Sequence, residues 1–242
     1  MPNPFYDPGR ARSDKVQQLF SGIARRYDLI NDLQSFGLHR CWKNRLVKMA
    51  RPHALEKALD ICCGTGDIAF ALAKHEAEIV GLDFSEAMLV IAESKVQRSK
   101  SIIHNPRFFR GDAQKIPFPD ESFDIVTVGY GLRNLADWEL GLKEMCRVAK
   151  PGARILSLEF GKPENAMWRK IYFAYLRCFV PLLGKIFSNN SAAYAYILES
   201  LKHFPAQNGI AAKMKELKLE NVRVVNFFGG VMSINYGEKP RA

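Results

Sequence analysis

At 242 residues, with 48% hydrophobic and 25% charged residues, the chain has the composition of one folded α/β domain and not that of a disordered chain. The first ten residues carry prolines and charges, and no stretch reaches the ~18 uncharged apolar residues of a transmembrane helix, so we expect a cytoplasmic protein. The five cysteines show no CxxC spacing, which argues against a disulfide framework or a zinc site, and no metal is expected.

The net charge of +10 is unevenly placed, because residues 10–51 hold ten Lys/Arg against three Asp/Glu. Nucleic acid and an anionic membrane surface both attract such a protein, and a solvated basic face is the simpler alternative. No recognised RNA-binding module and no NPPY-type motif is present, so we expect no nucleic-acid partner. A transient, peripheral contact with the inner face of a membrane is compatible with the sequence, and so is a homodimer.

The first fifty residues predict a helical cap, 1–50. In VQQLFSGIARRYDLI, apolar residues recur three or four positions apart, as on one face of a helix. These residues are Val16, Leu19, Phe20, Ile23 and Tyr27. Pro52 then ends the helical pattern before the first strand.

Residues 51–160 alternate between short apolar runs and helical stretches of about ten residues, which predicts buried parallel strands covered by helices on both faces. Ser85 stands where it would cap the helix that follows the second strand. The helix at 138–150 is expected to stop at Pro151-Gly152. The expected strands lie at 57–63, 77–83, 106–112, 123–131 and 153–160.

The remainder predicts a helical insert or lid, 161–205, followed by a C-terminal helix and hairpin, 206–242. Two strand-like runs, 221–228 and 230–237, flank a turn at Gly229-Gly230. The expected architecture is therefore a single α/β domain with a mostly parallel seven-stranded sheet and an antiparallel C-terminal hairpin.

The insert carries an apolar stripe at helical spacing, while its basic residues Arg169, Lys170, Arg177 and Lys185 lie elsewhere. Such a stripe is either buried core or the face of a substrate lid that touches a membrane interface transiently. We expect Pro181 and Gly184 to break or kink this helix. The stripe comprises Trp168, Ile171, Tyr175, Phe179, Leu182 and Ile186.

The sharpest local motif is LDICCGTGDIAFAL (59–72), in which Gly64 and Gly66 separate a strand from a helix. Ala69 completes the spacing of dinucleotide binders, so NAD is one candidate ligand. Asp60 and Asp67 favour the other candidate, because a diphosphate is repelled by carboxylates whereas the ammonium and sulfonium of S-adenosylmethionine are attracted. Helix capping is the simplest alternative for Asp67.

Two further acidic positions follow expected strands. Asp83 ends the second strand, nineteen residues after Gly64, where a carboxylate accepts hydrogen bonds from both ribose hydroxyls of either cofactor. Asp112 and Ala113 follow the third strand in GDAQKIPFPD, and an ordinary turn is the alternative for that aspartate.

Together these motifs make the chain resemble the UbiE/COQ5 family of quinone-biosynthetic C-methyltransferases over about residues 13–238. The specific stretches are YDLIND…SFGLHR and GLRN, supported by LDICCGTGD, GLDFSEAML, GDAQKIPFPDESFD, VAKPG, LEFGKP and YILESLKHFP. The resemblance implies a Rossmann-like class I methyltransferase fold. It also implies methylation of a prenylated hydroquinone in menaquinone or ubiquinone biosynthesis, with demethylmenaquinol foremost. Another small lipophilic acceptor, or an NAD-dependent oxidation, stays open.

Residue by residue, the resemblance implies that S-adenosylmethionine meets Thr65, Asp83, Asp112 and Ala113. It places Asp67, Arg133 and Asn134 at the methyl-transfer centre. The family commonly has Ser where Gly129 stands and His where Asn235 stands, so no role is carried over to those two positions.

The chemistry requires an electron-rich acceptor, because only the reduced quinol, after loss of a hydroxyl proton, offers a nucleophilic ring carbon. Asp67 and Arg133 are expected to act through a positioned water, with Arg133 stabilising the developing phenolate. His39 and His203 are alternative bases, although lone histidines more often pack or cap.

Overall fold

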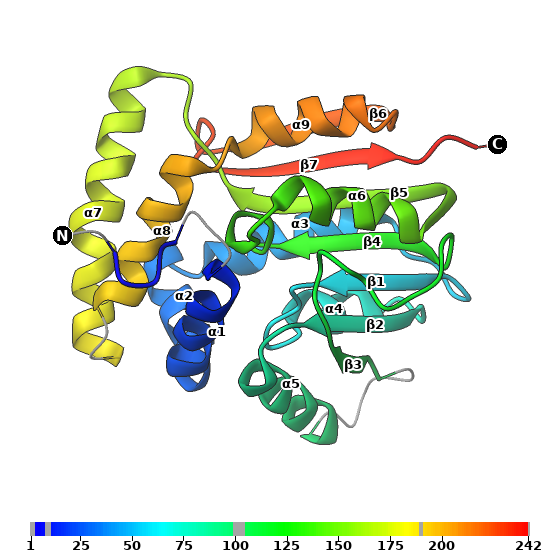
Figure 1. Ribbon diagram of the computed structural model, residues 1–242, viewed down its shortest axis with the longest axis horizontal. Coiled ribbons are helices and arrows are strands. Elements are labelled where there is room, and N and C mark those ends of the chain that lie inside the picture. Colours follow the sequence, from blue (N-terminus) through cyan, green and yellow to red (C-terminus); the bar gives the residue numbers. More distant parts are fainter. Residues whose placement is uncertain (1–2, 8–10, 99–104, 189–190, 242) are drawn as a thin grey trace.

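The computed structural model describes residues 3–7, 11–98, 105–188 and 191–241. Within these ranges seven strands form one sheet in the order β3-β2-β1-β4-β5-β7-β6 (Figure 1). The strands are β1 (Lys57–Ile61), β2 (Glu78–Asp83), β3 (Arg107–Arg110), β4 (Phe123–Gly129), β5 (Ala149–Phe160), β6 (Glu220–Phe227) and β7 (Met232–Glu238).

The sheet is parallel from β3 to β5, and β7 runs antiparallel to both of its neighbours, β5 and β6. Between β6 and β7 the chain turns at Gly229 and Gly230, whose φ angles of 66° and 97° suit residues without a Cβ. The expected seven-stranded, mostly parallel sheet with a C-terminal hairpin is therefore confirmed.

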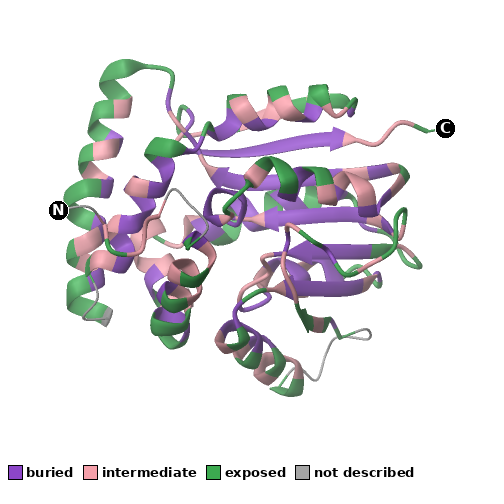
Figure 2. Cartoon of the chain, in the orientation of Figure 1, coloured by how far each residue is buried: buried purple, intermediate pink, exposed green. Residues whose placement is uncertain are grey.

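Helices cover both faces of the sheet because successive residues of each strand point to opposite sides. Ala58 packs under α3 (Leu38–Ala50) and α4 (Asp67–Ala73), whereas Leu59 faces the second core. That second core lies beneath α5 (Glu86–Arg98), α6 (Trp138–Val148) and α9 (Ala206–Glu216). Figure 2 shows the central strands almost wholly buried, while exposed residues lie on the outer sides of the helices, in loops and on the edge strands.

A group of helices from both ends of the chain covers one end of the sheet, at the carboxyl ends of the parallel strands (Figure 1). It consists of α1 (Arg12–Ile23), the 3₁₀ turn η1 (Ala24–Arg26), α2 (Tyr27–Ser35), α7 (Ala166–Ser188) and α8 (Ser191–His203). The loops that follow β1, β2, β3 and β4 therefore face these helices. Ligands of open α/β sheets bind at this end of the strands.

Most strand ends differ from the expected bounds by one or two residues, and two larger differences concern prolines. The helix α6 ends at Val148 and β5 begins at Ala149, so the strand starts before Pro151-Gly152. The helix α7 continues through Pro181 to Ser188 and is not broken there. A proline removes only the bond to the carbonyl four residues earlier, which belongs to exposed Arg177 and is open to water. In the described part of the chain, no helix is both long and apolar enough to span a bilayer.

Candidate active site

The loop after β1 contains two glycines with different tasks. Gly64 has φ +56°, its backbone N–H donates to Asp83 Oδ2 at 2.8 Å, and a Cβ built on it would meet no protein atom within 4 Å. Gly66 has φ +85°, and a Cβ there would lie 2.8 Å from the Phe108 ring. Gly64 therefore leaves ligand space open, whereas Gly66 allows α4 to begin close against β3.

Asp83 ends β2 and presents a carboxylate that backbone groups hold in place. Its Oδ1 accepts the N–H of Ser85 at 2.8 Å, while Oδ2 accepts that of Gly64. Burial raises the pKa of Asp83, and the two backbone donors oppose that shift. The expectation that Ser85 caps α5 is wrong for its side chain, because the buried Oγ has no hydrogen-bond partner. That hydroxyl is available to a ligand.

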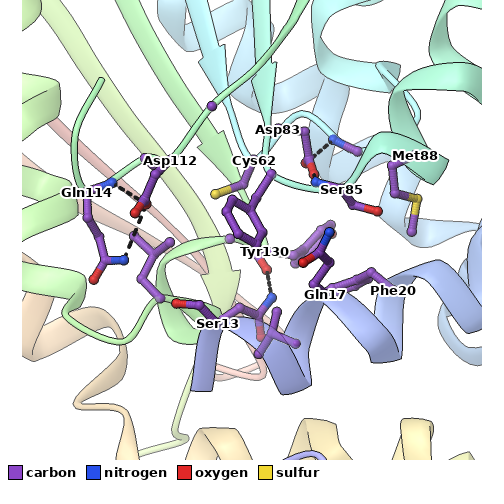
Figure 3. A pocket seen from close by; sticks show the side chains of 18 of the residues that line it. Ser13, Gln17, Phe20, Cys62, Asp83, Ser85, Met88, Asp112, Gln114 and Tyr130 are labelled. Atoms are coloured by element: carbon purple, nitrogen blue, oxygen red, sulfur yellow. Dashed lines mark hydrogen bonds between the residues drawn. The ribbon is translucent and has the colours of Figure 1, made fainter. Parts of the chain in front are cut away.

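These groups line a cavity with about 780 Å³ of empty space, which we call the donor pocket (Figure 3). Among the predicted residues, Gly64, Asp83, Asp112, Ala113 and Asn134 line it. Figure 3 shows Asp83 and Asp112 on the sheet side and Ser13, Gln17 and Phe20 of α1 on the facing side.

The donor pocket offers the groups that a nucleoside with a cationic tail needs. Asp83 is placed for vicinal hydroxyls, and Asp112 keeps its carboxylate in the cavity while its Oδ1 accepts the Gln114 N–H at 2.8 Å. Asn134 lines the cavity, and its Oδ1 is buried without a partner. Unsatisfied oxygens of this kind suit positively charged ligand groups, so the residues present fit S-adenosylmethionine.

Asp60, Thr65 and Gly66 do not line the donor pocket. Asp60 lies beneath the loop, where it accepts the Thr127 hydroxyl at 2.8 Å and burial raises its pKa to about 7. The Thr65 hydroxyl donates to Asp28 of α2 at 2.7 Å. Direct cofactor contact by these three residues stays a prediction.

Asp67, at the start of α4, lies in a cluster of charges between the sheet and the helices that cover it. Lys43 Nζ is 2.7 Å from Asp67 Oδ2 and Lys95 Nζ is 3.1 Å from Oδ1, and Lys95 also contacts Asp28 at 2.8 Å. Burial alone would raise the pKa of Asp67, but the two ammonium groups hold it at about 2. The carboxylate is thus ionised, and its charge is balanced by the two lysines. Asp67 lines neither the donor pocket nor the second cavity beneath the covering helices.

A second cavity, with about 800 Å³ of empty space, lies between the sheet end and the covering helices, and we call it the acceptor pocket. Its wall is predominantly aromatic and aliphatic, which suits a flat, apolar ligand. Phe20, Tyr27 and Tyr130 line both pockets, so the two cavities meet at these three side chains. The aromatic lining comprises Phe20, Tyr27, Trp42, Tyr130, Phe160, Tyr172, Tyr175, Tyr194 and Tyr196.

Arg133 supplies a buried positive charge to the acceptor pocket from the 3₁₀ turn η2 (Leu132–Asn134) after β4. Its Nη1 donates to Glu159 Oε2 at 3.0 Å and to the Tyr130 carbonyl at 2.6 Å, while its buried Nε has no partner. Burial raises the pKa of Glu159, and the guanidinium opposes this. The Glu159 carboxylate thus fixes the guanidinium at the wall of a cavity that is mostly apolar.

Tyr130 stands where the pockets meet and has an unusual backbone. Its φ is +61°, which costs about 1–3 kcal/mol for a bulky residue and is typical of functional sites. The backbone is held from three sides, because its N–H donates to the Leu158 carbonyl at 2.7 Å and its own carbonyl accepts from Arg133 and Asn134. Arg133 and Asn134 thus also act as clamps on this strained turn.

The two candidate histidines are placed very differently. His39 lines the acceptor pocket, its Nε2 lies 2.8 Å from Asp32 Oδ1, and its buried Nδ1 has no partner. Burial and Lys43 lower the pKa of His39, against the effect of Asp32. His203 is about half exposed and stacks on Tyr6 away from both pockets. Asn235 is buried under α9, where its Nδ2 donates to the Gln207 carbonyl at 2.8 Å.

Several site residues escaped the sequence analysis. Glu159 is the one charge in the apolar run ILSLEF, and that irregularity in a buried strand was a usable signal. Tyr130 lies in the expected strand 123–131, which gave no reason to assign it a role in the site. Lys43 and Lys95 gave no signal, because a lysine on a helix is most often solvated.

The comparisons with known proteins agree with this geometry. The profile of the ubiE/COQ5 methyltransferase family matches residues 9–239. The ubiquinone/menaquinone biosynthesis C-methyltransferase UbiE of Azotobacter vinelandii is 37% identical over 236 residues, which cover 96% of this chain and 93% of that protein. The demethylmenaquinone methyltransferase of Staphylococcus aureus is 37% identical over 235 residues, 96% of each chain.

A solved structure gives the same result for the fold. A methyltransferase from Thermotoga maritima, described as a possible histamine N-methyltransferase, superposes with a TM-score of 0.65 at 19% identity, over 93% of this chain and 99% of that one. At this identity the likeness concerns the fold alone, which is the class I methyltransferase fold expected from the sequence. With a family match over nearly its whole length, the chain belongs to the ubiE/COQ5 methyltransferase family and is a methyltransferase.

Proposed function

We propose that this protein transfers the methyl group of S-adenosylmethionine to a ring carbon of a prenylated hydroquinone, with demethylmenaquinol as the foremost substrate. The printed names of the two relatives support this acceptor class, since one names ubiquinone and menaquinone biosynthesis and the other demethylmenaquinone. The ring type, benzoquinol or naphthoquinol, is left to experiment.

The observation that carries the proposal is the meeting of two unlike cavities at Phe20, Tyr27 and Tyr130. One cavity presents carboxylates and unsatisfied oxygens for a charged nucleoside. The other is walled by aromatic rings and holds one fixed guanidinium. Methyl transfer to a lipophilic quinol requires the cationic donor and the apolar acceptor side by side, and two adjoining cavities of these two kinds suit that reaction.

In the donor pocket Asp83 would hold the ribose hydroxyls, Asp112 and Ala113 the adenine, and Asn134 the cationic end of the cofactor. S-adenosylmethionine supplies an electrophilic methyl group on a sulfonium. Transfer would form a carbon–carbon bond to the ring, break the sulfur–carbon bond and leave a neutral thioether. The ring carbon would then lose its hydrogen as a proton to water, and the phenolate oxygen would regain the proton taken up by the base.

In the acceptor pocket the chain must remove a hydroxyl proton and stabilise the resulting negative charge. Arg133 is suited to the second task, because Glu159 fixes its guanidinium at the wall of a mostly apolar cavity, where a preorganised cation stabilises an oxyanion more than it would in water. Only the reduced substrate offers such a hydroxyl, so the oxidised quinone should not react.

The geometry favours His39 as the base among the candidates. His39 lines the acceptor pocket, has a free Nδ1 and a lowered pKa that keeps it neutral near pH 7, and is oriented by Asp32. Asp67 has its charge matched by Lys43 and Lys95. Asp67 would then act indirectly, by fixing α3 and α5 around the donor pocket.

An NAD-dependent reaction is the alternative from another class of enzyme. The expected repulsion between Asp67 and a diphosphate no longer argues against NAD, because Lys43 and Lys95 balance the charge of Asp67. The support for S-adenosylmethionine now comes from family membership and from Asp112 and Asn134 in the pocket lining. Isothermal titration with S-adenosylmethionine and with NAD separates the two. We expect micromolar binding of the former and none of the latter, and the reverse result would remove the proposal.

The decisive assay supplies methyl-labelled S-adenosylmethionine with demethylmenaquinone or a demethylated ubiquinone precursor, each offered reduced and oxidised. We expect label on a ring carbon of a reduced acceptor and none on the oxidised forms. Label on another small lipophilic acceptor alone would keep the methyltransferase but replace its substrate.

A further inference from the structure

The helix α7 is apolar on two adjacent sides. Tyr172, Leu176 and Val180 are at most 5% exposed and pack inward. The predicted stripe lies on the neighbouring side and is not core, since Ile171, Leu182 and Ile186 are at least half exposed. We call the outer face the set Met167, Trp168, Ile171, Phe179, Leu182 and Ile186, all of which are exposed.

The end of α2 extends this outer face. The Tyr175 hydroxyl donates to the Gln34 carbonyl at 2.6 Å, and Arg26 donates to the Phe187 carbonyl, so α2 lies along α7. Two residues past Gln34, Phe36 has φ +51° and is 74% exposed. Phe36 therefore adds an exposed aromatic ring to the apolar side chains of the outer face, and together they form a contiguous apolar patch.

The charges around the outer face are positive. Residues 166–188 contain four Lys/Arg and no Asp/Glu. Lys170, Arg177 and Lys185 are exposed and form no ion pair with the described residues. Arg25 and Arg26, in the turn η1 that precedes α2, are exposed as well. Apolar side chains bordered by uncompensated cations are complementary to a bilayer with anionic headgroups.

Part of the acceptor pocket lies beside this face. Its lining residues Gln34, Ser35 and Tyr175 are only half-buried, and they lie at the end of α2 and on α7. A prenyl chain that leaves the pocket here meets Phe36 and the outer face before it meets water.

We propose that the outer face of α7, together with Phe36, docks this protein on an anionic membrane surface, and that the acceptor enters from the bilayer between α2 and α7. The route of the acceptor rests on the proposed function. The docking itself is a property of the empty protein and is measured without substrate.

The test compares the full-length protein with the double variant I171E/L182E by flotation with phosphatidylglycerol/phosphatidylcholine vesicles and with phosphatidylcholine vesicles. The variant V90E/L140E is the matched control, because Val90 and Leu140 are 55% and 40% exposed on α5 and α6, apart from the outer face. We expect binding to the anionic vesicles, at least about tenfold weaker for I171E/L182E and unchanged for V90E/L140E.

A short-chain, water-soluble quinol provides the activity readout. I171E/L182E should methylate this quinol at the parent rate and a long-chain quinol in vesicles at least about tenfold more slowly. Failure of the parent to float, or equal flotation of both double variants, would overturn the docking proposal. A parent dimer that I171E/L182E dissociates without loss of flotation would assign the face to a second copy instead. If no quinol is methylated but I171E/L182E still floats more weakly than the parent and V90E/L140E, the proposed function is wrong and the docking proposal is supported.

Discussion

The donor and acceptor pockets touch, yet the chain builds them in different ways. The donor pocket is formed mainly by short loops after β1, β2, β3 and β4, and its polar groups are held by backbone hydrogen bonds such as those from Gly64 and Ser85 to Asp83. The acceptor pocket is formed mainly by side chains of α1, α2, α3, α7 and α8, which come from two widely separated parts of the sequence.

This difference in construction indicates that the donor pocket is the fixed part of the site and that the acceptor pocket is the part that can vary. The sheet fixes where the donor binds, because loop geometry at the strand ends follows from strand pairing. The acceptor pocket depends on packing between helices, which can change shape with a few side chains. A common donor site can therefore serve different acceptors.

Replacing Arg133 gives the largest expected effect on the acceptor side. Arg133→Ala should lower kcat about 10²–10³-fold, as for loss of an oxyanion stabiliser, with little change in S-adenosylmethionine affinity. Because it leaves Glu159 buried without its cation, the variant should also unfold more easily. R133A/E159Q is the control, since it should recover stability without recovering activity. Equal loss of turnover and cofactor affinity would contradict the division between the pockets.

His39→Asn tests the base. General-base loss predicts a kcat about 100-fold lower. The pKa of His39 is lowered, so its neutral, active form persists below the usual titration range of histidine, and the parent rate should stay level at neutral pH and fall only on acidification. The measurement is the pH profile of kcat/KM for parent and variant. A decrease of less than threefold would indicate that water, and not His39, removes the hydroxyl proton.

Asp83→Asn tests the donor pocket. Loss of a charge-assisted acceptor for the ribose hydroxyls predicts S-adenosylmethionine binding about 10- to 100-fold weaker by calorimetry, with an unchanged KM for the acceptor. Asp124→Asn is the matched control, because Asp124 also accepts a backbone N–H, that of Lys57, but lies outside both pockets. A comparable loss in the control would point to a general structural effect.

Asp67→Asn gives the smallest expected change in kcat, less than about threefold, if Asp67 mainly joins helices. Its folded pKa of about 2 lies below the usual value of 3.8, so its stabilisation is present above pH ~4 and is lost as the pH falls toward 2. The variant should melt a few degrees lower at pH 7 and at pH 5, and the gap should narrow only below about pH 4. A gap that closes between pH 7 and pH 5 would contradict these ion pairs.

The same contrast explains what the sequence could predict. The strands and the positions of Gly64, Asp83 and Asp112 follow from local patterns, because each depends on residues within one strand–loop unit. The closeness of Arg133 to Glu159 depends on the pairing of β4 with β5. Tyr175 and Gln34 are 141 residues apart in the sequence, and the spacing of residues along the chain does not predict that they form a hydrogen bond.

The most direct test of the central claim is a crystal structure with S-adenosylhomocysteine and a reduced short-chain demethylmenaquinol analogue. We predict the nucleoside on Asp83, its sulfur facing the junction at Tyr130, and the quinol ring beyond it in the acceptor pocket with a hydroxyl toward Arg133. A ring bound outside that pocket, or a sulfur directed away from Tyr130, would contradict the account.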